Sequence, residues 1–178
     1  MEMTEQRSFV DRLIGAARLD SSVYEEVEHD RDATGQAAAV VVAGSIAAGV
    51  AAIGELGVAG LILGVVGGLV GWAVYAWVTY FIGTKILAGA ETSADWGELA
   101  RTLGFANGPR ILLVIGVVSV LNALVSLIVL IWVLITTVVA VRAALDIGTG
   151  RAIVVALIGV IVAGIILGVA YGIADAIA

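Results

Sequence analysis

Residues 111–141 read ILLVIGVVSVLNALVSLIVLIWVLITTVVAV and contain no charged side chain. As one helix this stretch would be about 46 Å long at about 1.5 Å per residue, whereas the hydrocarbon core of a bilayer is about 30 Å thick. A single span of that length would need a steep tilt. The sequence therefore predicts two spans here, with a hinge near Asn122.

The rest of the chain also has the composition of a membrane protein. Hydrophobic residues make up 61% of the 178 residues and charged residues 13%, and the mean hydropathy is +1.13. These values lie far from those of soluble domains. We expect an all-α, polytopic integral membrane helix bundle, with a cytoplasmic arm at 1–35 and a five-span membrane domain at 36–178. The spans are predicted at about 36–53, 58–84, 100–121 (broken near 108–109), 123–141 and 152–174.

The basic residues fall only at alternate ends of the apolar segments. They are Arg7, Arg12, Arg18 and Arg31, then Lys85, Arg101 and Arg110, then Arg142 and Arg151. Cytoplasmic loops keep Lys and Arg, and five spans place every basic residue on one side, whereas four would divide them. This predicts a multi-pass protein of the cell membrane with its amino terminus in the cytoplasm and its carboxyl terminus outside. The excess of Arg over Lys, with much Ala, Gly and Val, indicates a prokaryotic source.

Cys and His, which often act as catalytic groups or metal ligands, are nearly absent from this chain. There is no Cys and one His, His29, which lies in an acidic run. No pair of carboxylates lies at helical spacing inside an apolar segment, and the Gly-rich second segment lacks the Lys and Ser or Thr of a phosphate-binding loop. The sequence therefore predicts no enzyme, no cofactor, no metal site and no nucleic-acid partner.

The cytoplasmic arm is expected to form two short amphipathic helices. Its apolar residues recur on one helix face, and Ser8 with Asp11, then Ser22 with Glu25, have the spacing of helix-start capping boxes. The residues of the apolar face are Phe9, Val10, Leu13, Ile14 and Ala17. One interpretation is that this helix packs on the protein's own cytoplasmic face. The other is that it contacts the membrane or a partner protein.

The polar segment at 92–110 predicts a broken third span. Asp95 and Glu98 have capping-box spacing, and the apolar face that follows is Trp96, Leu99, Leu103 and Ala106. Gly104, Gly108 and Pro109 interrupt this helix just before residues 111–121, which are too few to cross a bilayer as a helix. We expect an interfacial helix, a kink at Gly108 and Pro109, and then a short membrane half.

Small residues recur at four-residue spacing in two of the spans. These helix-packing candidates are Gly60, Gly64 and Gly68 in the second span, and Gly164, Gly168 and Gly172 in the last. In lipid, such faces let helix backbones approach closely. They are interpreted as packing faces within the bundle, with a homo-oligomer seam as the alternative.

Two stretches of the chain resemble prokaryotic members of the Yip family, the Ypt/Rab-interacting membrane proteins. The matching residues are Asp11 to Ile14, Tyr24 to Glu26, Ala33 to Gln36, Trp96 to Leu99, Arg101 to Ala106, and Pro109. In that family a cytoplasmic region precedes five spans, and a Gly-aromatic pair followed by Pro lies at the third. Gly104, Phe105 and Pro109 look like that motif here, and with Trp96 and Arg101 they form the candidate partner or structural motif. The resemblance implies a protein that acts through membrane or protein partners.

The sequence is compatible with two functions. The first is a non-enzymatic membrane protein that organises membrane or protein partners through its cytoplasmic face, with the lipid bilayer, a membrane or cytoplasmic protein, or a second copy as partner. The alternative is a transport or channel component whose pathway runs through the broken third span, lined by Asn107, Ser119 and Asn122. The absence of a charged residue at mid-span weighs against transport.

Overall fold

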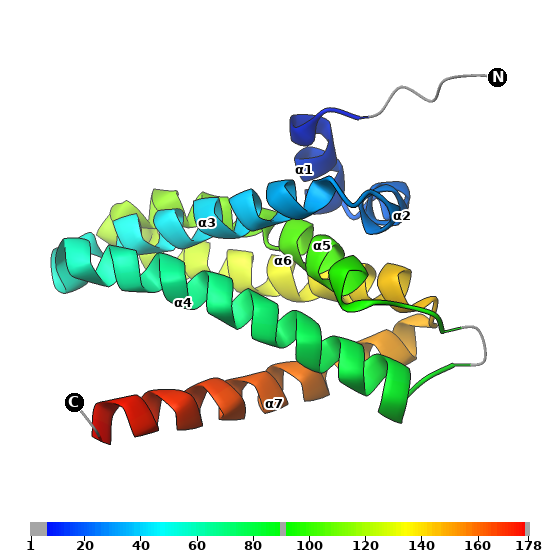
Figure 1. The fold of residues 1–178 in the computed structure, drawn as a ribbon. Helices are drawn as coiled ribbons and strands as arrows, with labels where there is room; N and C mark the ends of the chain where they lie inside the picture. The colour runs from blue at the N-terminus through cyan, green and yellow to red at the C-terminus, as the bar shows by residue number, and fades with distance from the viewer. Residues whose placement is uncertain (1–6, 90–91, 177–178) are drawn as a thin grey trace.

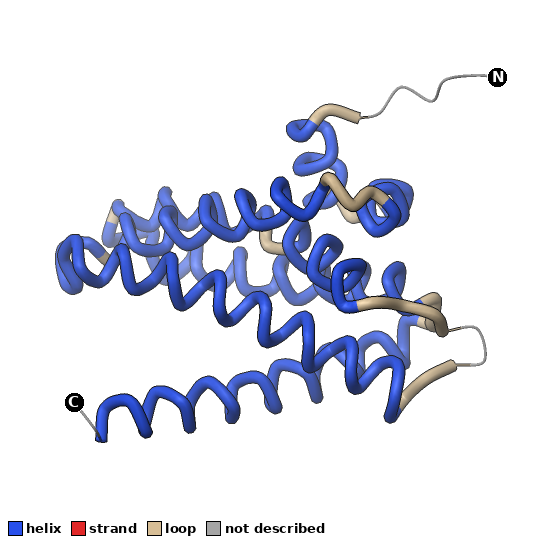
Figure 2. The backbone as a smooth tube through the Cα atoms, in the orientation of Figure 1, coloured by secondary structure: helices blue, strands red, loops and turns tan. Residues whose placement is uncertain are grey.

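The computed structural model describes residues 7–89 and 92–176, and every regular element within those residues is helical. The elements are α1 (Phe9–Ala17), α2 (Ser21–His29), α3 (Ala33–Ala51), α4 (Ile53–Phe81), the π-helix η1 (Ile82–Ile86), α5 (Trp96–Ala106), the 3-10 helix η2 (Gly108–Val117), α6 (Ser119–Leu145) and α7 (Thr149–Ala176). The long helices lie side by side, and α1 and α2 sit at one end of the bundle (Figure 1). Loops are short and lie mainly at the ends of the helices (Figure 2).

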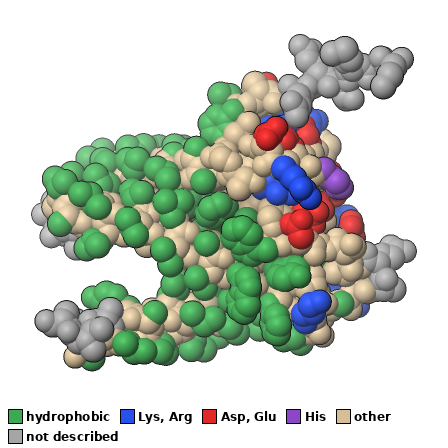
Figure 3. Space-filling view, in the orientation of Figure 1, with side chains coloured by type: hydrophobic (Ala, Val, Ile, Leu, Met, Phe, Trp, Pro, Cys, Tyr) green, Lys and Arg blue, Asp and Glu red, His purple; other side chains and the backbone are tan. Residues whose placement is uncertain are grey.

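Four of the described helices are long and apolar enough to cross a membrane. They are Ala33–Ala51, Gly57–Ile86, Val120–Leu145 and Thr149–Ile173. The visible charged side chains gather at the end of the molecule that carries the arm, and apolar side chains are spread over the helices away from that end (Figure 3). The all-α class and the membrane-protein composition are therefore confirmed.

The arm folds into the two helices α1 and α2, and only one of the two expected caps is correct. Ser8 caps α1, and its Oγ accepts a hydrogen bond from the Asp11 amide at 3.2 Å. Ser22 does not cap α2, because the helix begins one residue before it and Asp20 is the cap, accepting from the Ser22 amide at 3.0 Å. Leu19, with φ of 66°, makes the tight turn between the helices and so sets this start.

The third element consists of an α-helix, α5, followed from Gly108 by the 3-10 helix η2. The capping box of Asp95 and Glu98 is present at the start of α5, and the helix ends at Ala106. Pro109 lies in the first turn of η2, where a residue without an N–H group costs no helical hydrogen bond. The part after the break is a 3-10 helix, which rises about 2.0 Å per residue and so covers more distance than an α-helix of equal length.

The turn after the third element lies slightly earlier than expected. The chain leaves η2 at Val118, which has extended backbone angles, and α6 begins at Ser119. Asn122 is therefore inside the first turns of α6 and not at the hinge. Its side-chain Nδ2 donates to the carbonyl of Gly116 at 3.0 Å, which satisfies one of the last carbonyls of η2.

The third element runs parallel to α3 along most of its length. A Cβ atom on Gly104 would lie 2.5 Å from Ala37 Cβ, one on Gly44 would lie 2.9 Å from Arg110 Cβ, and one on Gly116 would lie 3.6 Å from Ala51 Cβ. The contacts advance in the same direction on both segments, from the arm end to the opposite end. The break at Pro109 therefore does not turn the chain away from α3.

The closely packed core lies at the arm end of the bundle. The largest fully buried apolar side chains include Tyr24, Leu99, Leu103, Phe105 and Leu145. Trp72 Nε1, on α4, donates to the Ala100 carbonyl at 2.9 Å and so ties α4 to α5. Toward its carboxyl end α7 is open, with Tyr171 76% exposed.

We predict that Gly104→Ala destabilises the protein, because the new methyl group would overlap Ala37 and force α3 and α5 apart. Overpacking of this kind costs about 1–3 kcal/mol. Thermal unfolding of the purified protein in detergent should show a lower midpoint. Gly64→Ala is the matched control, since no atom lies within 4 Å of its added Cβ. Equal midpoints for the two variants would contradict the close approach of α3 and α5.

Candidate functional site

Arg101 joins the third element to the cytoplasmic arm. Its side chain is 5% exposed, and Nε donates to the carbonyls of Val27 and Glu28, each at 3.0 Å. Nη2 also donates to the Glu28 carbonyl. These carbonyls belong to the last turn of α2, where helix carbonyls lack partners and carry partial negative charge. Arg101 therefore caps α2 with a cation and fixes it against α5.

The turn of α5 that follows Arg101 binds the other arm helix and α3. Phe105 is fully buried, and its ring meets that of Phe9 edge-on at a centroid distance of 6.2 Å. Gly104 approaches Ala37 as described above. Three positions in the carboxyl-terminal half of α5 thus contact three other helices: α2 through Arg101, α3 through Gly104 and α1 through Phe105.

The remaining motif residues divide between the interior and the surface. Pro109 is buried in η2, and a Cβ on the neighbouring Gly108 would lie 2.9 Å from Leu13 Cδ1 of α1. Trp96 is 40% exposed, and its Nε1 donates to the Ala73 carbonyl at 3.3 Å. Of these residues, Arg101 and Phe105 contact the protein's own arm, Gly104 packs on α3, and Pro109 is buried in η2. Trp96 is the one motif residue left at the surface.

A buried arginine holds the two arm helices together. Arg12 is 2% exposed, and its guanidinium lies 2.9 Å from Glu26 and 2.7 Å from Asp30, while Nη1 donates to Gln36 at 3.1 Å. Burial by itself would lower the pKa of Arg12, but the hydrogen bonds with Asp30 and Glu26 raise it overall. The sequence pattern did not single out Arg12, although its place beside the apolar residue Leu13 marks it as close to the core.

Glu28 is a second buried charged residue that sequence reasoning missed. It is 4% exposed, and its Oε2 has no hydrogen-bond partner among the described residues. Burial raises the pKa of Glu28 to about 7, and the carboxylates of Glu25, Glu98 and Asp146 add to the shift while His29 opposes it. A carboxyl group that changes charge near neutral pH therefore lies where α2 meets α5.

The arm leaves part of its apolar surface uncovered. Val10 is 56% exposed and Ile14 45% exposed, both on α1. At the carboxyl end of the same helix, Trp132 Nε1 of α6 donates to the Ala17 carbonyl at 2.7 Å. The arm thus packs on the protein and also presents apolar side chains outward, and its contact with the membrane or a partner stays a prediction.

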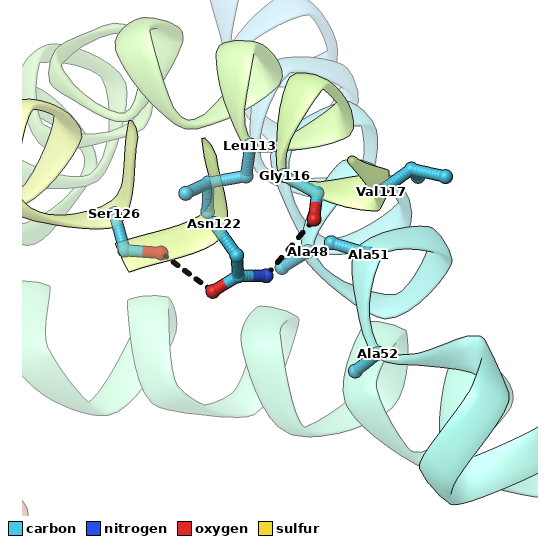
Figure 4. A pocket seen from close by; sticks show the side chains of 8 residues that line it. All are labelled: Ala48, Ala51, Ala52, Leu113, Gly116, Val117, Asn122 and Ser126. Atoms are coloured by element: carbon cyan, nitrogen blue, oxygen red, sulfur yellow. Dashed lines mark hydrogen bonds between the residues drawn. The ribbon is translucent and has the colours of Figure 1, made fainter. Parts of the chain in front are cut away.

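A cavity of about 540 Å³ lies at the other end of the bundle, between α3, η2 and α6. It is lined by Ala48, Ala51, Ala52, Leu113, Gly116, Val117, Asn122 and Ser126 (Figure 4). Asn122 is the residue of the proposed transport pathway that reaches this cavity. Asn107 instead donates to the Leu103 carbonyl at 2.8 Å, and the side chain of Ser119 lies outside the described residues.

The glycine faces behave differently in the two spans. Gly68 packs against Ser45 of α3, whereas a Cβ on Gly64, Gly164, Gly168 or Gly172 would meet no atom within 4 Å. Gly60 is half-buried. Among these predicted packing glycines, Gly68 therefore packs against another helix of the described chain. The face of α7 formed by Gly164, Gly168 and Gly172 is left open. The described residues also contain no group of three or more His, Cys, Asp or Glu that could hold a metal ion.

Comparison with known proteins identifies one family. The family profile described as "Yip1 domain" matches residues 20–171, which include the end of the arm and most of the membrane helices. No curated protein and no solved structure matches the chain significantly.

We predict that Glu28→Gln stabilises the protein at pH 8 and has little effect at pH 4. The native state keeps a proton on Glu28 up to a pKa of about 7, against an ordinary value of 4.5. Its favourable contribution is therefore full below pH 4.5 and is lost as the pH rises through about 7. The gain at pH 8 should be about 1–3 kcal/mol in the free energy of unfolding.

Denaturation midpoints of the wild type and the variant, measured across this pH range, give the difference directly. Asp32→Asn is the control, because Asp32 is an exposed carboxylate on the same arm whose side chain does not cap α3. An equal difference between Glu28→Gln and the wild type at both pH values would show that Glu28 does not titrate in this range.

Proposed function

Because this chain belongs to the Yip1 domain family, we propose that it is a non-enzymatic multi-pass membrane protein that organises membrane or protein partners through its cytoplasmic face. The observation that carries the proposal is the contact of Arg101 with the end of α2. It makes the arm and the third element one folded surface at the charged end of the molecule. A partner that binds there meets a preformed surface, so little ordering entropy is lost on binding.

The bilayer is crossed five times in this proposal, with α5 and η2 together forming the third crossing. Support comes from the parallel contacts of this element with α3, which extend from Ala37 to Ala51. An element that follows a spanning helix in this way covers the same depth. Non-helical backbone is tolerated at membrane depth when protein buries it, and η2 lies between α3 and α6.

The charged end faces the cytoplasm in this proposal, and the membrane is the cell membrane. The arm, Lys85, Arg142 and Arg151 all lie at that end of the helices, as the positive-inside rule requires of cytoplasmic segments. The carboxyl terminus is then outside. The contact residues are Val10 and Ile14 of the arm with Trp96 of α5, because these are apolar, exposed and on the same side of the membrane. A second copy is a further partner, through the open glycine face of α7.

A transport function is the alternative, and the cavity at Asn122 is the observation that favours it. Its polar groups are the Asn122 amide, the Ser126 hydroxyl and the Gly116 carbonyl, which bond to one another (Figure 4). A solute pathway needs such groups across the full depth of the bilayer. None of the residues that line this cavity is ionisable, which makes transport the weaker proposal.

We predict the labelling pattern of single cysteines introduced into this Cys-free chain. The positions are Ser21 in the arm, Val120 at the start of α6 and Thr149 before α7, all of which are described, and Val120 is 88% exposed. Five crossings with a cytoplasmic arm expose only Val120→Cys to an impermeant maleimide added to intact cells. If the third element did not cross, Val120→Cys would be protected together with Ser21→Cys, and Thr149→Cys would react from outside.

We predict that a photoreactive amino acid at Ile14 forms discrete protein adducts or phospholipid adducts in cells. Ile14 is 45% exposed on the cytoplasmic surface proposed here. The same group at Leu157, 51% exposed on α7, is the control for general contact with lipid and membrane proteins. A defined set of adducts at Ile14 that is not seen at Leu157 supports the proposal. Identical adducts at both positions, with a solute flux in reconstituted vesicles that Asn122→Ala abolishes, would favour transport.

A further inference from the structure

Arg110 is a partly buried cation with little to balance its charge. Its one hydrogen bond is from Nη1 to Asn107 Oδ1, at 3.4 Å, and no carboxylate of a described residue lies within 4.0 Å of it. The other two buried or partly buried arginines are satisfied: Arg12 by two carboxylates, and Arg101 by the carbonyls of α2. A cation in a low-dielectric setting normally has an anionic partner. Arg110 lacks one within the described chain.

A cavity of about 350 Å³ lies directly beside this side chain, between η2 and α6. Its lining consists of Arg110, Leu113, Ser126, Val129, Leu130 and Val133. η2 and α6 run antiparallel, because Thr136 bonds to the Ala106 carbonyl at one end and Asn122 to the Gly116 carbonyl at the other. Arg110 and Val133 therefore mark the end of the cavity nearer the arm. The rest of the lining, apart from Ser126, is apolar.

The arm helix α1 places Arg110 at the depth of the lipid headgroups. Leu13 of α1 contacts Gly108, and Trp132 of α6 bonds to the Ala17 carbonyl, so α1 lies level with the first turn of η2. An amphipathic helix with exposed apolar residues lies about 5–10 Å into the boundary between headgroups and acyl chains, and Trp is enriched at that boundary. Arg110 follows Gly108 by two residues, about 4 Å in a 3-10 helix. Its hydrogen bond to Asn107 directs the guanidinium back toward the headgroup side.

We propose that Arg110 and this cavity bind one anionic glycerophospholipid from the leaflet on the arm side of the membrane. The phosphate pairs with the guanidinium, which can make two parallel hydrogen bonds to it. One acyl chain fills the cavity against Leu113, Leu130 and Val133. The cavity falls within the size range of small-molecule sites, and its combination of apolar walls with one cation at the end matches the two parts of a phospholipid.

Charge complementarity at this residue, and not general attraction, selects the anionic lipid. The chain carries a net charge of −6, so its overall field does not favour an anionic membrane surface. Free inorganic phosphate would meet the same guanidinium but would leave the apolar cavity unfilled. The site therefore distinguishes a lipid from a soluble phosphate by the contribution of the acyl chain.

Native mass spectrometry of the full chain released from detergent, titrated with phosphatidylglycerol, measures this binding. We expect Arg110→Gln to weaken binding of the first phosphatidylglycerol roughly tenfold or more, since a lost charge-assisted pair is worth at least that factor. Arg142→Gln is the matched control, because Arg142 is exposed, lies on the same side of the membrane and does not line this cavity. Its affinity should stay within about twofold of the wild type, as expected for an exposed charge.

A second variant tests the acyl half of the site with the cation left in place. Leu130→Trp puts a larger side chain at the 57% exposed wall of the cavity, so phosphatidylglycerol binding should also weaken while Arg110 is unchanged. This variant decides the question if Arg110→Gln proves unstable. Wild-type affinity in both variants would overturn the proposal. Competition by glycerol 3-phosphate at the same concentration as the lipid would also overturn it, because the site would then hold phosphate without the chain.

Discussion

The close approach of Gly104 to Ala37 is the contact on which the rest of the arrangement depends. It allows the third element to lie directly on α3 at the arm end, and the contacts at Arg110 and Gly116 then continue along the same helix. Because the element stays on α3, its 3-10 half is covered by protein on two sides. In the hydrocarbon of a bilayer, non-helical backbone is tolerated where protein buries it. The packing of η2 against α3 and α6 provides such cover after Pro109.

The same end of α5 makes the arm part of the membrane domain. Arg101 balances the partial charge at the end of α2, and Arg12 balances Glu26 and Asp30 inside the arm. Oε2 of Glu28 has no hydrogen-bond partner among the described residues, and burial raises the pKa of Glu28 to about 7. The interface of the arm with the third element therefore contains one satisfied cation and one unsatisfied acid. Because burial raises the pKa of Glu28, we expect the docked arm to be less favoured once this carboxyl group ionises.

Local sequence signals predicted the local structure well, and long-range contacts were mostly beyond them. The capping box at Asp95 follows from residues close together in the chain and is present, and α5 ends before Pro109. The predicted start of α2 at Ser22 was wrong, because Asp20 caps the helix instead. The turn at Leu19, which has a positive φ, places Asp20 in the capping position. The spacing of Gly164 and Gly168 predicts a packing face but cannot say which helix meets it, and within the described chain none does. Glu28 was missed because its burial arises from helices distant in sequence.

The distance in sequence between Arg101 and the carbonyls it binds has a consequence for biosynthesis. The contacts link residues 73 and 74 positions apart. Chain synthesis proceeds from the amino terminus, so the arm emerges first, yet its binding site on α5 is made only after α3 and α4. During insertion of that first hairpin the arm has no place to dock. The arm is therefore synthesised well before the site on α5 that binds it, and a factor that contacts the nascent chain would meet the arm undocked.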